Sequence, residues 1–343
     1  MVEFISKELE IRNKEISEPV ETIYFGGGTP SLLDLREINQ IFETIYSQFS
    51  VISHPEITLE ANPDDLTLSK LQEIKSSPIN RLSIGIQSFF DEDLRLMNRA
   101  HNANEAIGSI QTAQDLGFEN ITIDLIYGGQ TTIDEVWQQN LETALKLDVP
   151  HISSYALTVE PQTVLAHQIQ TKKLVDVDEE KQERQFQMLI RTLTAHGFMH
   201  YEISNFAKQG FLSRHNSNYW KGKSYLGVGP SAHSYDGKNR SWNLANNSIY
   251  LKNLAENKLV NEIEVLSEND RFNELIMISL RTIYGLNLDE LKSNFPDDFI
   301  NDLSKEIQPH LEHQSLRIEN GILYLTEKGK FLADGIASSL FRV

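Results

Sequence analysis

The segment Thr22-Ile-Tyr-Phe-Gly-Gly-Gly-Thr-Pro30 is a short apolar, β-branched run that ends in a glycine-rich turn, and a helical pattern over Asp34–Tyr46 follows it. The same order of β-type run, turn and helix recurs through the first half of the chain. Further strands are predicted at Ile57–Glu60, Arg81–Ile86, Ile121–Ile126 and His151–Leu157. Further helices are predicted at Met1–Ile16, Thr67–Ile74, Asp91–Met97, Asn104–Leu116, Ile133–Leu147 and Asp178–His196. Repeated units of this kind predict an α/β fold with a parallel sheet, either a barrel or an open doubly wound sheet.

The pattern changes near Ser267. A helix is predicted over Phe272–Leu280, a short strand over Leu323–Leu325 and a final helix over Gly329–Leu340. We therefore expect a β/α domain over residues 1–240 and a small α-rich domain over residues 241–343.

Composition narrows the possible functions. The chain has 343 residues, a formal net charge of −18 and no cysteine. The negative charge disfavours a nucleic-acid partner. No apolar run is long enough to cross a bilayer, and the N-terminus lacks the order of a secretory signal, so we expect a cytoplasmic protein that is not transmembrane. Without cysteine, the chain can form no disulfide and can bind no zinc ion or iron–sulfur cluster through thiolates.

Polar or glycine-rich positions follow several predicted strands. The turn Gly26-Gly-Gly-Thr-Pro30, Glu60 and Gln87-Ser88 each come at a strand end, and Asp124 lies inside an apolar strand. Because the carboxyl ends of parallel strands share one edge of a sheet, these groups predict a ligand site there. Gly227-Val-Gly-Pro-Ser-Ala232 is similar to a dinucleotide fingerprint, but no convincing helix follows it, and we reject a nicotinamide site.

Several longer motifs occur in one order along the chain. They are Phe25–Pro30, Glu60-Ala-Asn-Pro63, Arg81–Phe89, Asn98-Arg99, Ile123–Gly128, Ser154–Pro161, Tyr201–Ala207, His215–Trp220, Gly227–Tyr235 and Leu325–Lys330. In this set and order the chain resembles the HemW and coproporphyrinogen-dehydrogenase branch of radical SAM proteins, over essentially its whole length. The resemblance implies an incomplete parallel β/α barrel with a small C-terminal helical domain.

The resemblance also implies binding of S-adenosylmethionine. Gly27, Gly28 and Thr29 would lie against its methionine portion, and Glu60, Gln87, Arg99, Asp124 and Ala156 would surround the cofactor. One departure follows Gly128, where the family has an apolar residue and proline and this chain has Gly129-Gln130. We expect a more mobile loop at that point.

His215-Asn-Ser-Asn-Tyr-Trp220 resembles the HNxxYW motif of HemW heme chaperones, and it favours them over oxygen-independent coproporphyrinogen III oxidases. Imidazole is a natural axial ligand of heme iron, and Tyr219 and Trp220 are suited to cover the porphyrin. Arg214 is a candidate partner for a propionate, and His233 is a weaker candidate for the same pocket. The implied function is to bind heme and deliver it to target proteins, membrane respiratory enzymes among them.

Radical SAM proteins of this branch hold a 4Fe–4S cluster in a CxxxCxxC loop after a first strand. This chain begins inside the helix that follows that loop, and it contains no cysteine. We expect no cluster and no reductive cleavage of S-adenosylmethionine, and we expect Thr22–Phe25 to be a sheet edge. A shortened chain and a natural cluster-free paralogue remain alternative explanations.

Overall fold

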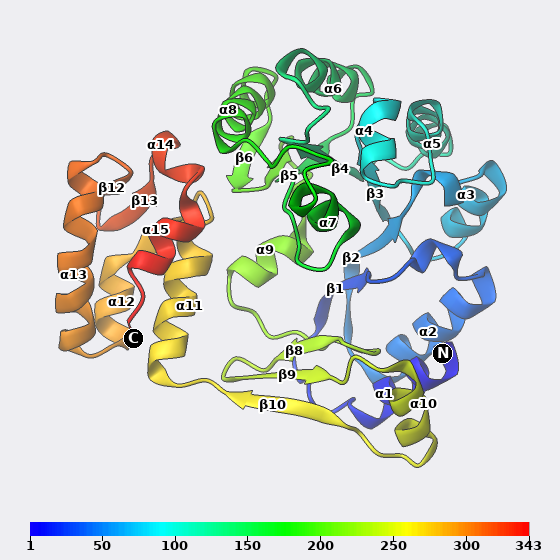
Figure 1. Cartoon of the computed structure of the whole chain (residues 1–343). Coiled ribbons are helices and arrows are strands. Elements are labelled where there is room, and N and C mark those ends of the chain that lie inside the picture. The colour runs from blue at the N-terminus through cyan, green and yellow to red at the C-terminus, as the bar shows by residue number, and fades with distance from the viewer. Residues whose placement is uncertain (343) are drawn as a thin grey trace. The chain divides into compact units, whose positions relative to one another are not determined.

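Seven strands form one sheet in the order β1-β2-β3-β4-β5-β7-β6 (Figure 1). The computed structural model describes residues 1–342. The strands are β1 (Val20–Phe25), β2 (Val51–Ala61), β3 (Arg81–Gln87), β4 (Ile121–Tyr127), β5 (His151–Ala156), β6 (Met199–Glu202) and β7 (Asn205–Ala207). Strands β2 to β5 pair in parallel, whereas β7 pairs antiparallel with both β5 and β6. The sheet is a half-barrel, as expected, and β1 is its edge strand.

Strand alternation explains how the sheet is buried. Ile84, Ile123 and Ile152 are fully buried on the side where the helices pack, while Asp124 and Ser153 lie on the opposite, concave side. The helices of this half are α3 (Leu68–Lys75), α4 (Asp91–Leu96), α5 (Ala103–Asp115), α6 (Asp134–Lys146), α7 (Val164–Gln170) and α8 (Glu179–Ala195). Figure 1 shows α5, α6 and α8 outside strands β3 to β5. Polar groups are therefore concentrated on the concave face.

The chain divides into two compact units that do not follow its linear order. Unit 1 comprises Met1–Ile23, Asp34–Pro55 and the segment from Ser213 to the C-terminus. Unit 2 comprises Tyr24–Leu33 and Glu56–Leu212. Strands β1 and β2 contribute residues to both units.

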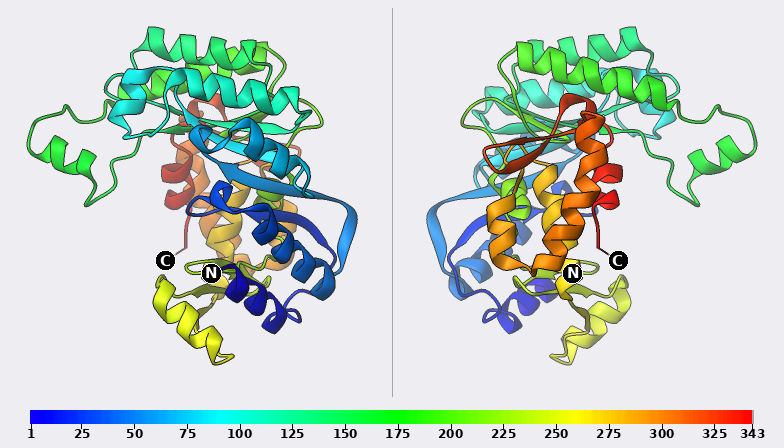
Figure 2. Two further views of the ribbon diagram at one scale, coloured as in Figure 1. Left: turned by 90° about the vertical axis from the view of Figure 1, so that its right-hand side faces the viewer. Right: turned by 90° about the vertical axis from the view of Figure 1, so that its left-hand side faces the viewer.

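Unit 1 contains the N-terminal helices and everything after Ser213. Its helices are α1 (Val2–Ile11), α2 (Leu35–Gln48), α9 (Arg214–Trp220), α10 (Asn247–Ala255), α11 (Glu268–Leu280), α12 (Leu288–Asn294), α13 (Asp297–Glu312), α14 (Glu327–Lys330) and α15 (Ala333–Ser339). Two three-stranded sheets complete it: β8 (His233–Tyr235), β9 (Asn239–Asn243) and β10 (Asn261–Val265), and β11 (Leu286–Asn287), β12 (Leu316–Glu319) and β13 (Ile322–Leu325). The views in Figure 2 place α11 beside α13, and Phe272 meets Phe299 edge-on with ring centroids 5.0 Å apart.

Several boundaries differ from prediction, two of them at the ends of the chain. The first helix ends at Ile11 rather than Ile16, and the single final helix is two helices, α14 and α15. Thr326 caps α14 by accepting a hydrogen bond from Gly329 N at 3.2 Å, so this helix begins before Gly329. Within residues 1–342, no helix combines the length and the apolar content needed to cross a membrane.

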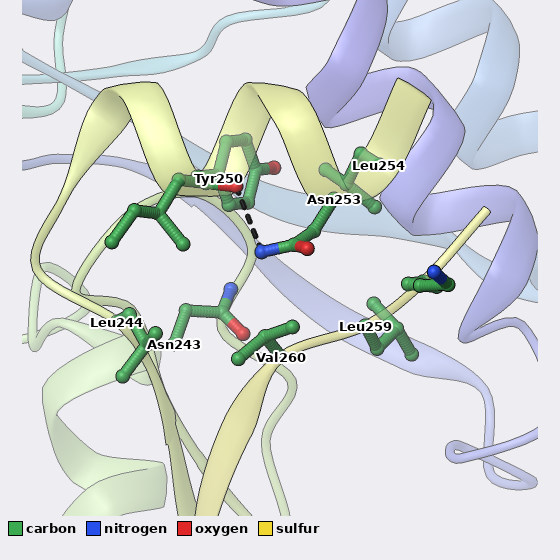
Figure 3. A pocket seen from close by; sticks show the side chains of 9 residues that line it. Asn243, Leu244, Tyr250, Asn253, Leu254, Leu259 and Val260 are labelled. Atoms are coloured by element: carbon green, nitrogen blue, oxygen red, sulfur yellow. Dashed lines mark hydrogen bonds between the residues drawn. The ribbon is translucent and has the colours of Figure 1, made fainter. Parts of the chain in front are cut away.

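A small pocket lies beside α10 in unit 1 (Figure 3). Asn243 and Leu244 line one side of it, Tyr250 and Asn253 another, and Val260 a third. The Asn253 amide donates to the main-chain oxygen of Ile249 at 2.9 Å and therefore contributes to the helix rather than to a ligand. The space holds about one water molecule and offers no room for a cofactor.

Candidate functional site

The glycine-rich turn and Glu60 form one hydrogen-bonded group in unit 2. Glu60 Oε1 accepts from the Tyr24 hydroxyl at 2.7 Å, and its Oε2 accepts from Gly27 N at 3.0 Å. Gly27 and Gly28 have φ of +74° and +62°, backbone angles that residues other than glycine rarely adopt. A Cβ at either position would meet no atom within 4 Å, so open space lies over the turn. The turn is therefore a main-chain cradle beside a carboxylate.

Arg99 and Gln87 extend this group across β3. The Arg99 guanidinium donates to Asn62 Oδ1 at 2.8 Å and to Gly85 O at 3.2 Å. A Cβ at Gly85 would lie 3.1 Å from Gln87 Nε2 and 3.3 Å from an Arg99 nitrogen. Both side chains therefore end over the same glycine, and a larger residue there would displace them.

Asp124 is a carboxyl group whose pKa is strongly raised by its surroundings. It lies in the middle of β4, where burial and then the negative charge of Glu60 raise its pKa from 3.8 to about 7. A hydrogen bond from Ser153, and then the positive charge of Arg99, lower the Asp124 pKa in part. At neutral pH the pocket thus holds Glu60, a partly protonated Asp124 and one cation.

The structure brings Gly27, Glu60, Gln87, Arg99 and Asp124 together, and their role as cofactor ligands stays a prediction. Thr29 precedes a short 3-10 helix at Pro30–Leu32 and accepts from Leu32 N through its main chain. Ala156 ends β5 and faces away from the Asp124 side of the sheet, so only its main chain could reach a ligand.

Sequence reasoning missed two residues of this pocket. Tyr24 holds Glu60, and Ser153 is the register partner of Asp124 on β5. The alternation of side chains along a strand carried a signal for both residues. It places Tyr24 on the same side as Gly26 at the end of β1, and it places Ser153 on the same side of β5 as Tyr155.

The loop after Gly128 is tied to its neighbours. Gly128 N donates to Gln185 Oε1 at 2.8 Å, and Lys181 Nζ donates to Gly129 O at 2.7 Å. The Thr132 hydroxyl donates to buried Asp93 at 3.0 Å. These hydrogen bonds attach the loop to α4 and α8, and its greater mobility stays a prediction.

The turn at Gly227–Ala232 leads into strand β8, in agreement with the rejection of a dinucleotide site. In unit 1, fully buried Glu8 accepts from Gly229 N at 2.9 Å and from the Tyr250 hydroxyl at 2.6 Å. Arg12 pairs with Glu8 at 2.9 Å and donates to Gly227 O at 2.8 Å. A protein carboxylate thus contacts the main chain where a phosphate would have to bind.

The histidine–aromatic motif forms α9 in unit 1. His215 Nδ1 and Thr22 Oγ1 are 3.2 Å apart, and the Tyr219 ring lies edge-on to the imidazole with centroids 5.5 Å apart. Lys223 pairs with Glu21 at 2.9 Å, which lowers the Glu21 pKa. The contacts with Glu21 and Thr22 fix α9 against edge strand β1. They also orient the imidazole through one of its nitrogens, as in metal-ligating histidines.

The other members of the predicted heme set contact other residues. Trp220 is five residues further on, about 140° around the helix, and the Arg281 guanidinium carbon lies 5.3 Å from its ring centroid. His233 is on β8 and stacks on Trp242 at 5.7 Å. Arg214 donates to His54 O at 3.0 Å. Only His215 and Tyr219 therefore share one face.

The residues present do not fit a 4Fe–4S cluster, because the chain has no cysteine. Within the described residues, no group of three or more His, Cys, Asp or Glu side chains is placed to hold a metal ion. The Gly27 cradle, Glu60 and Arg99 do fit a small zwitterion that carries an additional positive charge.

Comparison with known proteins identifies the class. The family model described as the radical SAM superfamily matches residues 3–144, and the HemN C-terminal domain matches residues 266–332. The coproporphyrinogen III oxidase HemN of Escherichia coli has the same fold, with a TM-score of 0.82 over 99% of this chain and 82% of that chain at 23% identity. The chain is thus a radical SAM-type half-barrel protein with a HemN-type C-terminal domain.

Similarity in amino-acid sequence identifies the family within this class. The heme chaperone HemW of Lactococcus lactis is 33% identical over 95% of this chain and 88% of that protein. The heme chaperone HemW of Bacillus subtilis is 32% identical over 92% of this chain and 84% of that protein. The chain belongs to the HemW family.

Proposed function

We propose that this protein is a cytoplasmic heme chaperone that binds heme through α9 and passes it to target proteins, membrane respiratory enzymes among them. The observation that carries the proposal is the shared face of His215 and Tyr219, with the imidazole oriented by Thr22 through Nδ1. We assign Nε2 as the iron ligand and the Tyr219 ring as a cover for one porphyrin edge. The names of the HemW relatives support heme as the cargo.

The pocket in unit 2 is proposed to bind S-adenosylmethionine. The Gly27 cradle and Arg99 suit the amino-acid part, and the carboxyl groups of Glu60 and Asp124 suit a sulfonium and ribose hydroxyls. Asp124→Ala should reduce binding, measured by equilibrium dialysis, far more than Asp178→Ala, because Asp178 lies at the exposed start of α8. Equal losses in both variants would remove Asp124 from the site.

Heme delivery is tested by transfer to an apoprotein. The chain is loaded with one equivalent of heme and mixed with apomyoglobin, and the rise of the myoglobin Soret band is followed. We expect complete transfer from the wild-type chain, at a rate set by release from the protein. Heme that stays on the chain, with no myoglobin formed, would contradict a delivery role.

Two alternative functions can be distinguished from heme delivery by measuring enzymatic activity and heme affinity. An oxygen-independent coproporphyrinogen III oxidase would convert coproporphyrinogen to a decarboxylated product, and we expect none from this chain because no thiolate is available for a cluster. A cluster-free binding paralogue would retain heme affinity without any gain when a cysteine-bearing upstream segment is added. Decarboxylated product from the chain itself would favour the oxidase.

A further inference from the structure

Gln87, at the end of β3, has a main-chain conformation that is unfavourable for a residue with a side chain. Its φ is +67°, and Ser88 N donates to Ile86 O at 2.9 Å across it. This hydrogen bond around a residue of positive φ defines a γ-turn of the rare, strained kind. The pairing of β3 with β4 shifts register at the same point, between Ile84 and Gln87. Such strain persists only where the surrounding structure holds it, and it is concentrated at binding sites.

The γ-turn reverses the direction of the Gln87 side chain. Gln87 is the register partner of Leu125 on β4, which is buried on the helix side of the sheet. A residue in regular strand conformation beside Leu125 would point its side chain to that same side. Gln87 Nε2 instead lies 3.1 Å from the position of a Cβ on Gly85, and an Arg99 nitrogen lies 3.3 Å from the same point. The turn therefore brings the Gln87 amide into the pocket of unit 2.

A buried histidine contacts the carbonyl group on which this turn depends. His101 Nε2 lies 3.0 Å from Ile86 O, and the His101 side chain is fully buried. Because a carbonyl oxygen can only accept, Nε2 carries the proton and donates it. Ile86 O thus accepts from two donors, Ser88 N within the turn and His101 from outside it. The second donor fixes the direction of the carbonyl group.

Packing alone does not account for a histidine at this place. Among residues 1–342, the other ring nitrogen, Nδ1, is buried and has no hydrogen-bond partner, and Asp64 Oδ1 lies 3.9 Å from it, too far for a hydrogen bond. A buried polar atom without a partner costs free energy, which an apolar side chain of similar size would avoid. The hydrogen bond to Ile86 O is what such a side chain could not supply.

We propose that His101 is a positioning residue of the S-adenosylmethionine site, which acts through the γ-turn to keep the Gln87 side chain in the pocket. The imidazole does not itself contact the ligand. The ligand part of this statement rests on the proposed function. The control of the Gln87 conformation by His101 does not.

The conformation of Gln87 is tested without ligand, by crystal structures of the wild type, His101→Leu and His101→Gln. Leucine fills the space without donating, whereas the glutamine amide can place an N–H near the position of Nε2. We expect Gln87 to keep its positive φ in the wild type and in His101→Gln, and to relax to a negative φ in His101→Leu. An unchanged γ-turn in His101→Leu would overturn the proposal. His101→Met, with a more adaptable side chain, takes the place of His101→Leu if the latter does not fold.

The ligand part is tested by a double-mutant cycle on the affinity for S-adenosylmethionine, measured by equilibrium dialysis. His101→Leu should weaken binding about five- to tenfold, the effect of one lost hydrogen bond, and His101→Gln should stay within about twofold of the wild type. In a Gln87→Ala background, His101→Leu should change the affinity by less than about twofold, because the side chain that His101 positions is already absent. Effects that multiply in the double variant would mean that His101 acts by another route, and the proposal would be wrong.

The matched control is His200, a second buried histidine of unit 2. Its Nε2 lies 3.0 Å from Ile203 O, but it is on β6, which β4, β5 and β7 separate from β3 in the sheet. His200→Leu should lower the Tm and leave the affinity for S-adenosylmethionine unchanged. An equal loss of affinity in His200→Leu would reduce the effect of His101 to general destabilisation and overturn its positioning role.

The two claims fail in distinguishable ways. If the wild type binds no S-adenosylmethionine and Gln87 still relaxes in His101→Leu, the proposed cofactor site is wrong and the control of the γ-turn by His101 stands. If the wild type binds the cofactor and the γ-turn is unchanged in His101→Leu, the positioning role is wrong and the proposed cofactor site stands.

Discussion

Asp124 should make stability depend on pH in a defined direction. Its folded-state pKa is raised from 3.8 to about 7, so the folded protein binds this proton more tightly than the unfolded chain does. The associated stabilisation is complete below pH 4 and is lost as pH rises to about 7. As pH rises across that window, the free energy of unfolding of Asp124→Asn should therefore increase relative to that of the wild type by about 3 to 4 kcal/mol. Urea unfolding measures this difference. A difference that does not vary with pH would contradict the raised pKa of Asp124.

Glu8 should be among the most sensitive residues of unit 1. It is fully buried and accepts hydrogen bonds from Arg12, Gly229, Asn243 and Tyr250. Glu8→Gln turns an amide NH₂ toward these donors and leaves Arg12 without its buried partner, so we expect a loss of about 3 kcal/mol in the free energy of unfolding. Exposed Glu10→Gln on the same helix is the control and should change stability by under about 0.5 kcal/mol. Similar losses in both variants would rule out a special role for the Glu8 network.

The sequence indicated the residues of the pocket that stand at strand ends, namely Glu60, Gln87 and the glycine-rich turn. It did not indicate that Asn205 on β7 would contact Ser153 on β5. That contact depends on β7 pairing antiparallel with β5, and the pairing joins residues about 50 positions apart. A periodic pattern reports which face a residue occupies, but it does not report which distant side chain completes a hydrogen bond.

Glycines in a turn and in a helix should respond oppositely to the same substitution. Gly27 has φ of +74°, so Gly27→Ala should cost about 1 kcal/mol in stability and weaken ligand binding. Gly108 lies within α5, and a Cβ there meets no atom within 4 Å, so Gly108→Ala should stabilise by up to about 1 kcal/mol. Thermal unfolding measures both, and a stabilising Gly27→Ala would mean that the turn does not require glycine.

Elements with strong periodicity were predicted within a few residues, as for β4 and α8. Strands and loops were expected over residues 201–242, but the bounds of β8 and β9 and the presence of β10 were not predicted, because these strands are short and, apart from Ile263 and Val265, largely polar. It also missed the start of β2 at Val51, where Pro55 interrupts the apolar pattern. The split between α14 and α15 was missed although Thr326-Glu-Lys-Gly carried a capping signal, since the final apolar run alone suggested one helix.

At the scale of the whole molecule, the absence of cysteine should exclude cluster chemistry. Anaerobic reconstitution with iron and sulfide should leave the chain without a stoichiometric cluster, because no thiolate ligand is available. A strong reductant with S-adenosylmethionine should then yield no 5′-deoxyadenosine. Cluster and product together would contradict this prediction, whereas their appearance only after a cysteine-bearing upstream segment is added would favour a shortened chain.

Heme binding at α9 is the claim on which the account depends, and it is independent of any cluster. The most direct measurement is a titration of the purified chain with heme, followed by visible absorption, for the wild type, His215→Ala and His233→Ala. We expect a saturable spectrum of histidine-ligated heme for the wild type and for His233→Ala. His215→Ala should show an altered Soret band and weaker retention of heme, because the proposed iron ligand is gone. An unchanged spectrum and affinity in His215→Ala would contradict the assignment of the heme site to α9.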